Sequence, residues 1–197
     1  MATSSLVSKN NHFHPSGIGW GRGVAAALFV GVIAFEFTRV GNILLTTHVG
    51  GMTNPHIFTI GYEKTTQAEL IAALKKAGVT QLIDVRARPI SRKPGFSKKA
   101  LAAALAEEGV DYVGLTALGT PPDGRDAARD HRLADLDRIY SAQLETPEAE
   151  LAAQQLEALV NEKPSALLCY ERDPEFCHRT LLHNKILAGY AVTDLYP

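Results

Sequence analysis

The chain has 197 residues with 20 basic and 21 acidic side chains, and apolar residues make up 46% of it. These values are typical of a globular protein and exclude a disordered, collagen-like or polytopic membrane chain. A formal net charge of −1 excludes binding of nucleic acid through overall charge, although it is compatible with a local basic patch. Two cysteines make no disulfide framework and indicate a reducing compartment, so we expect a cytoplasmic protein.

The amino-terminal quarter differs in composition from the rest of the chain. Residues 1–53 contain 8 of the 16 glycines and only four charged side chains, and their segment 24–35 is apolar throughout. That segment is shorter than the roughly 20 residues of a membrane-spanning helix. Extending it to 24–45 would place Glu36 and Arg39 inside a membrane, which is costly. We predict no helix or strand with recognisable caps before Met52.

Three interpretations of residues 1–53 stay open. The first is a leader that is disordered or lies outside the functional chain, which would then begin at Met52. The second is a membrane anchor through the apolar segment 24–45. The third is a cleaved signal peptide, although no small-residue cleavage pattern follows the apolar run. Since the anchor is only one of three alternatives, we count no membrane among the expected partners, and a single domain is expected over residues 54–197.

From Ile57 onward, β-prone apolar runs alternate with helical patterns. Strands are expected at residues 57–62, 81–86, 111–115, 165–171 and 192–196. Helices are expected at residues 66–77, 97–109, 133–144, 146–163 and 173–188, with Thr66, Ser97 and Thr146 as caps and a polar loop over 119–130. The alternation predicts an α/β fold in three layers, with a mostly parallel sheet and helices on both faces. Ligands of such sheets bind beyond the carboxyl ends of the strands, so the polar residues after each strand are the candidate site residues.

The most specific feature is the tripeptide Cys177, His178 and Arg179, which is expected in the first turns of the last helix. A helix amino terminus has unpaired N–H groups and a partial positive charge, and both favour a thiolate or a bound anion. Cys177 is therefore a candidate nucleophile, with His178 as a proton carrier at neutral pH and Arg179 as an anion ligand. The alternative is a purely structural role, in which Cys177 packs as a small apolar residue and Arg179 pairs with an acidic side chain.

Three arginines and a serine lie at the end of the second predicted strand and in the loop after it, namely Arg86, Arg88, Ser91 and Arg92. Guanidinium groups suit phosphate and carboxylate, so this loop is a candidate contact surface for a phosphate or for nucleic acid. The alternative is a solvated basic loop whose arginines pair with nearby acidic residues.

Three further residues at predicted strand ends complete the candidate site. Asp84 lies inside an apolar strand, so it is expected to be partly buried and either paired with a base such as Arg86 or active in proton transfer. Glu171, at the end of the fourth strand, is the better candidate for a general acid or base. Tyr62 follows the first strand and either contacts the substrate or simply packs.

A zinc site formed by Cys169, Cys177, His178 and His183 is not favoured by the sequence. Two cysteines separated by seven residues and followed by histidine do not match a usual zinc pattern, and Cys169 lies in a predicted buried strand. We therefore expect no metal and no cofactor.

Three segments resemble a known family. TIGYEK, LIDVRARPISRKPGFSKKAL and LLCYERDPEFCHRTLL are similar to the motifs of the family called domain of unknown function 488 (DUF488). The resemblance covers about residues 57–188. It implies a compact α/β fold with a polar pocket, and it implies no particular reaction. The pocket residues that it suggests are Arg86, Ser91, Arg92, Glu171, Cys177, His178 and Arg179.

The sequence favours an enzyme of hydrolase or transferase type. Its expected substrate is an anionic, phosphate-containing small molecule such as a nucleotide, or a nucleic acid, bound at the carboxyl ends of the strands. Sulfur transfer in the manner of a rhodanese is an alternative, although the acidic residues Glu171 and Asp173 stand where an anion-cradling loop would begin. A non-catalytic module that binds nucleic acid or protein is the other alternative. The oligomeric state is not predicted.

Overall fold

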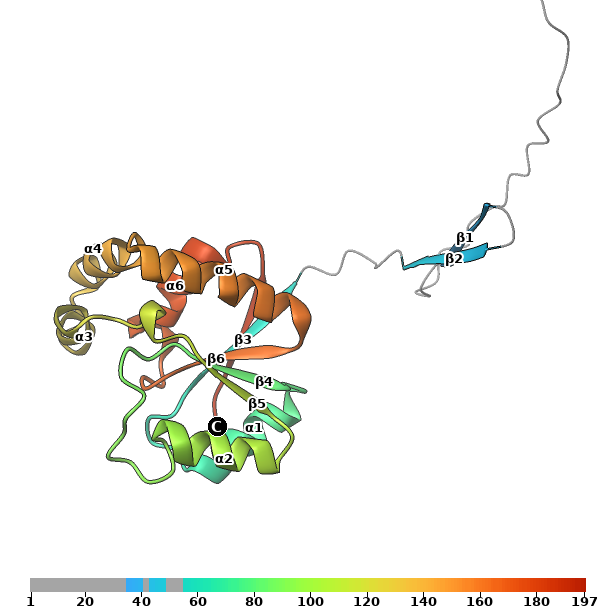
Figure 1. Cartoon of the computed structure of the whole chain (residues 1–197). Coiled ribbons are helices and arrows are strands. Elements are labelled where there is room, and N and C mark those ends of the chain that lie inside the picture. Colours follow the sequence, from blue (N-terminus) through green and yellow to red (C-terminus); the bar gives the residue numbers. More distant parts are fainter. Residues whose placement is uncertain (1–34, 41–42, 49–54) are drawn as a thin grey trace, which may run out of the picture. The chain divides into compact units, whose positions relative to one another are not determined.

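The computed structural model describes residues 35–40, 43–48 and 55–197 (Figure 1). The chain divides into two units, Met1–Gly51 and Met52–Pro197. In the first unit, β1 (Phe35–Val40) and β2 (Ile43–His48) pair as antiparallel strands. The expectation that no strand precedes Met52 is therefore wrong for these residues.

The apolar run that raised the question of a membrane anchor or signal peptide lies largely outside the described residues, since only its positions 35–40 and 43–45 are described and these are strands. Among the described parts of the chain, no helix combines the length and the apolar character needed to cross a membrane.

The second unit contains a five-stranded sheet in the order β5-β4-β6-β3-β7, and every neighbouring pair of strands is parallel. The strands are β3 (His56–Gly61), β4 (Gln81–Asp84), β5 (Asp111–Gly114), β6 (Ser165–Cys169) and β7 (Ala191–Leu195). β4 and β6 are buried along their whole length, as expected for central strands covered on both faces.

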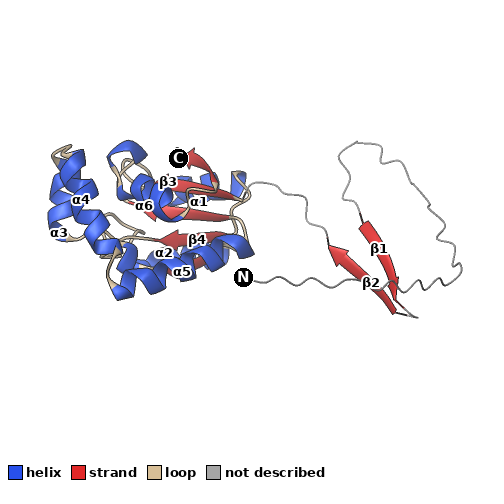
Figure 2. Ribbon diagram, turned by 90° about the horizontal axis from the view of Figure 1, so that it is seen from above, coloured by secondary structure: helices blue, strands red, loops and turns tan. Residues whose placement is uncertain are grey.

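Helices cover both faces of this sheet, so the predicted three-layer α/β fold is confirmed (Figures 1 and 2). One face carries α1 (Gln67–Lys76) and α2 (Lys98–Glu107). The other carries α4 (Leu133–Leu144), α5 (Pro147–Glu162) and α6 (His178–Ile186). The short helix α3 (Pro122–Arg129) packs beside α4 through Ala127, Ala128 and Leu136.

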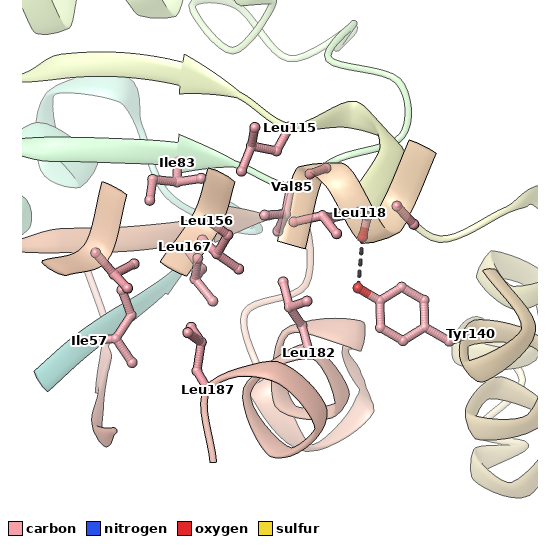
Figure 3. Packing of buried hydrophobic residues seen from close by; sticks show 13 residues of the cluster. Ile57, Ile83, Val85, Leu115, Leu118, Tyr140, Leu156, Leu167, Leu182 and Leu187 are labelled. Atoms are coloured by element: carbon pink, nitrogen blue, oxygen red, sulfur yellow. Dashed lines mark hydrogen bonds between the residues drawn. The ribbon is translucent and has the colours of Figure 1, made fainter. Parts of the chain in front are cut away.

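The apolar core between the sheet and α4–α6 is shown in Figure 3. Ile83 and Val85 point into it, and because successive side chains of a strand alternate between faces, Asp84 and Arg86 point to the face of α1 and α2. The hydroxyl of Tyr140 donates a hydrogen bond of 2.7 Å to the carbonyl oxygen of Leu118 within this core. The polar side chains of Asp84 and Arg86 therefore lie on the opposite face of the sheet from this apolar core.

Two expected helix starts are observed with their caps, and a third differs. Thr66 and Glu69 form a capping box at α1, and the Thr146 hydroxyl accepts a bond from Ala149 N at α5. Ser97 precedes α2, but its hydroxyl bonds the backbone of Ser91 in the preceding loop instead of the helix.

Two segments differ from the expected structure. The predicted polar loop over 119–130 contains the helix α3, which begins with Pro122 at its first position and buries Ala127 and Ala128. The predicted helix over 173–188 is a 3₁₀ turn (Pro174–Phe176) followed by α6, and Cys177 is the amino-terminal cap of α6 rather than a residue of its first turn.

Candidate functional site

The site is built where β6 ends and the chain crosses to α6. β6 and β3 continue to pair beyond their last strand residues, because Tyr62 N donates to the Cys169 carbonyl and Glu63 N to the Tyr170 carbonyl. Gly61 allows the two chains to meet closely: a Cβ atom there would lie 1.8 Å from the carbonyl oxygen of Glu171. Only glycine is compatible with this approach, which fixes the backbone of Glu171 against the end of β3.

The turn after Glu171 then brings the chain back to the carboxyl end of β6. Asp173 caps the 3₁₀ turn by accepting a bond of 3.0 Å from Glu175 N, and Pro174 begins it. The Thr180 hydroxyl donates to the Pro174 carbonyl and ties α6 to this turn. As a result Cys177 and His178, at the start of α6, lie beside the end of β6.

Four side chains converge at this point and are called here the cysteine cluster: Cys169, Glu171, Cys177 and His178. One potential ligand atom from each lies within 4.8 Å of the others. The Glu171 atom Oε2 is 2.8 Å from the Cys169 sulfur and 3.3 Å from the Cys177 sulfur. The His178 atom Nδ1 is 3.5 Å and 3.7 Å from the same two sulfurs. The two cysteines are buried and carry no disulfide, and Glu171 is partly exposed.

His178 is held by the neighbouring strand. Its Nε2 lies 3.0 Å from the carbonyl oxygen of Val85, and its ring meets the edge of Tyr140. A carbonyl oxygen only accepts hydrogen bonds, so Nε2 carries a hydrogen. In the neutral form of the ring, the lone pair of Nδ1 therefore faces the two sulfurs.

Arg179 encloses the cluster from α6 and is itself only 1% exposed. Its Nε donates to the Cys177 sulfur at 3.2 Å, and its Nη2 donates to the Glu171 carbonyl at 2.7 Å. The guanidinium therefore supports the cluster from within the protein.

The electrostatics of the cluster are strongly coupled. Burial opposes charge on Cys177, but the neighbouring Cys169 thiol and the positive charges of Arg179 and His178 outweigh burial and hold the Cys177 pKa well below that of an ordinary thiol. Burial, together with the interaction with Cys177, raises the pKa of the Cys169 thiol. Burial and the Cys177 charge also raise the pKa of Glu171. Of the two thiols in the cluster, Cys177 is therefore the more acidic.

Asp84 and Arg86 form a separate network on the other face of the sheet. Arg86 donates through Nε and Nη2 to the two carboxylate oxygens of Asp84, at 2.8 Å and 2.6 Å, and through Nη1 to Tyr62 and to the Phe96 carbonyl. The Tyr112 hydroxyl donates a further bond to Asp84. Burial works against the Arg86 charge, but its bonds with Asp84 prevail and raise its pKa.

The structure therefore brings together only part of the predicted site. Glu171, Cys177, His178 and Arg179 converge, whereas Arg86 bonds both Asp84 and Tyr62 on the opposite face. Tyr62 is 4% exposed and stacks on Phe96. In the loop before α2, Ser91 bonds Ser97 and Lys93, and the exposed Arg88 and Arg92 lie on the surface.

Cys169 is the cluster member that the sequence interpretation did not select as a site residue. The zinc hypothesis considered it together with His183, but the His183 ring lies near Asn184 and the Tyr190 carbonyl, and Glu171 takes the fourth position instead. A signal was present in the sequence: Cys169 and Glu171 are two residues apart at a strand end, which places them on the same side.

The parallel sheet and the buried polar groups at its carboxyl edge define an α/β protein with a cysteine cluster beyond its central strand. A family model described as "Domain of unknown function DUF488" matches residues 66–186, more than half of the chain, so the protein belongs to the DUF488 family. No curated protein and no solved structure matches the chain. The family membership predicted from the three motifs is confirmed.

Proposed function

We propose that this protein is an enzyme of hydrolase or transferase type that acts on an anionic substrate at the carboxyl edge of its sheet. One observation carries the proposal: two sulfurs, a carboxylate and an imidazole lie within 4.8 Å of one another at that edge. Burying such groups costs free energy that apolar side chains would not cost, and clusters with shifted pKa values are concentrated at functional sites.

Glu171 is the member of the cluster that a substrate can reach most readily, because it is partly exposed while the other three are buried. Its carboxylate suits the role of general acid or base. The Cys177 thiolate, supported by the bond from Arg179 Nε, suits either attack on the substrate or coordination of a metal.

The negative charge of the substrate is inferred from the loop between β4 and α2. Arg88 and Arg92 in that loop are exposed, as are Lys98 and Lys99 at the start of α2. Arg86 and Arg179 are bonded inside the protein, so the exposed pair Arg88 and Arg92 is the better candidate for contacting a phosphate group.

Anion binding is tested by the melting temperature of the full chain with phosphate, sulfate, nucleoside monophosphates and a short oligonucleotide. A ligand at 100 times its Kd stabilises the native state by about 2.7 kcal/mol. At least one anion is expected to raise the melting temperature, and the double variant R88A/R92A is expected to lose most of that shift. The exposed Arg138→Ala on α4 is the matched control. An equal shift in R88A/R92A, or no shift with any anion, overturns this part of the proposal.

Catalysis is tested by turnover of chromogenic phosphate monoesters and diesters. Replacing Glu171 by Gln removes the proton-transfer group while keeping its size, so we expect the rate to fall at least about 100-fold. The exposed Glu157→Gln on α5 serves as the control. Anion binding without turnover of any ester would favour a binding module instead of an enzyme.

A further inference from the structure

We infer that the cysteine cluster is a zinc site in which Cys169, Glu171, Cys177 and His178 each supply one ligand atom. The inference rests on the proposed function only in its role for the ion: if the protein is an enzyme, zinc would be the cofactor of this cluster. It depends on the geometry of four side chains that the chain brings together from the end of β6, the following turn and the start of α6.

The distances between the ligand atoms suit a tetrahedral ion. With zinc bonded to sulfur at about 2.3 Å and to nitrogen or oxygen at about 2.0–2.2 Å, tetrahedral angles separate a sulfur from a nitrogen or oxygen ligand by about 3.5 Å. His178 Nδ1 already lies 3.5 Å and 3.7 Å from the two sulfurs. Glu171 Oε2, at 2.8 Å from the Cys169 sulfur and 3.3 Å from the Cys177 sulfur, would move outward by up to about 0.7 Å, which a rotation of this partly exposed side chain allows.

The surroundings of the cluster match those of metal ligands. A ligating histidine donates its other ring N–H to a carbonyl or carboxylate, which fixes the lone pair toward the ion, and His178 Nε2 bonds the Val85 carbonyl in this way. Arg179 Nε donates to the Cys177 sulfur, which suits a thiolate that shares its charge with a metal.

The charges also balance. Two thiolates and a carboxylate carry three negative charges, and Arg179 supplies one positive charge within the buried site. A divalent ion would bring the total to zero, which removes the cost of burying unpaired charge. Zinc fits best among divalent ions because sulfur and imidazole ligands in a tetrahedral set select it over magnesium or calcium, which prefer oxygen ligands.

The competing description is a cluster held by hydrogen bonds alone, in which the Cys169 thiol donates to Glu171 and no ion binds. The two descriptions differ in a measurable way. The full chain, kept reduced, is stripped with a chelator, desalted and titrated with Zn²⁺ against a chromophoric chelator. We expect one zinc per chain, and we expect Cys169→Ser and Cys177→Ser to weaken binding more than tenfold.

The matched control is His183→Ala, which removes a histidine of the same helix that lies outside the cluster and should leave zinc affinity unchanged. If a cysteine variant fails to fold, the wild-type protein still decides the question. Co²⁺ added to it should give the visible bands of a tetrahedral site and a sulfur-to-cobalt charge-transfer band. Substoichiometric zinc, the absence of these bands, or equal affinity in the folded cysteine variants overturns the inference.

These measurements need no substrate, so the two proposals can fail separately. If the protein binds one zinc per chain, but no anion stabilises it and no ester is turned over, the zinc site is supported and the proposed enzymatic function is overturned. Turnover by a protein that binds no zinc would overturn the metal site and support the enzyme. Cys177 would then be the candidate nucleophile.

Discussion

Gly61 and Glu171 meet through their backbones, and a Cβ atom on Gly61 would lie 1.8 Å from the carbonyl oxygen of Glu171. The same hypothetical atom would lie 2.9 Å from the Cα of Arg172. Neither neighbour is the flexible end of a side chain, so the contact cannot be relieved by a rotamer change. The position of the cluster carboxylate therefore depends on the absence of a side chain at the end of β3.

Gly61→Ala is expected to lower the free energy of unfolding by about 3 kcal/mol, because the two backbones must separate. It should also weaken the function of the cluster, since Glu171 moves with its backbone. Urea denaturation measures the first effect. Gly189→Ala is the control, because a Cβ atom there meets nothing within 4 Å and should change stability little.

Asp84→Asn is expected to destabilise the protein by about 3–5 kcal/mol, because it leaves the buried guanidinium of Arg86 without its counter-charge. The comparison is Asp111→Asn, whose ion pair with Lys163 is accessible to solvent and should contribute far less to stability. Chemical denaturation of both variants gives the difference. Equal effects would show that the buried pair contributes no more than a surface pair.

Arg179→Lys is expected to lose stability even though the charge is kept. Arg179 reaches the Cys177 sulfur and the Glu171 carbonyl with two different nitrogens, and a lysine ammonium group cannot reproduce this planar fork. Because these buried groups lose a hydrogen-bond partner, the free energy of unfolding should fall by about 2 kcal/mol. Zinc affinity should fall about tenfold as well, as for other residues that support metal ligands. Arg138→Lys on the surface of α4 should change neither quantity.

Tyr140→Phe removes the hydroxyl that bonds the Leu118 carbonyl in the core shown in Figure 3. We expect the free energy of unfolding to fall by about 1–2 kcal/mol, because the Leu118 carbonyl oxygen stays buried, away from water, but no longer accepts a hydrogen bond. Tyr190→Phe provides the comparison, because its hydroxyl bonds the exposed Asn161 and water can replace it. Thermal unfolding of the two variants should separate them by several degrees.

The capping box of α1 predicts a pH-dependent contribution to stability. Backbone and side-chain hydrogen bonds from Thr66, followed by the bond from Thr65, lower the pKa of Glu69 below its ordinary value of 4.5. A carboxyl whose pKa is lowered by folding stabilises the folded state above its unfolded pKa, and this stabilisation is lost as the pH falls through the folded pKa. Wild type should therefore melt above Glu69→Gln at pH 7, and the difference should vanish in acid.

The exposed Glu157→Gln on α5 is the control for this experiment and should show a smaller, nearly constant difference from wild type. A Glu69→Gln difference that stays the same from pH 7 to pH 3 would show that the carboxylate charge does not stabilise this cap.

The fold was predictable because local signals agreed with one another. Thr66 and Thr146 begin helices where the sequence placed them, and the apolar runs around Ile83 and Leu167 form central strands. α3 was missed because two prolines and the charged residues around Gly124 are typical of a loop, whereas the helix packs against α4 through Ala127 and Ala128. Tertiary packing of this kind leaves no strong local signal.

The site was predictable only in part for a similar reason. That Glu171 and the residues 177–179 lie at the carboxyl edge follows from their positions after β6, but the approach of Cys177 and His178 to Cys169 depends on the fold of the turn between β6 and α6. The pairing of Asp84 with Arg86 was open to prediction, since residues two apart on a strand share a face. The further bonds of Arg86 to Tyr62 and to the Phe96 carbonyl depend on tertiary packing and have no local signal in the sequence.

The order of the strands also bears on how the protein is made. β3 lies between β6 and β7 in the sheet, yet β6 follows β3 by about 100 residues along the chain and β7 comes later still. A nascent chain thus carries β3 without either neighbour while about 100 further residues are synthesised. During that interval the backbone N–H and C=O groups along both edges of β3 are unpaired and can meet chaperones or other strands, so the central sheet forms only after β6 has been synthesised.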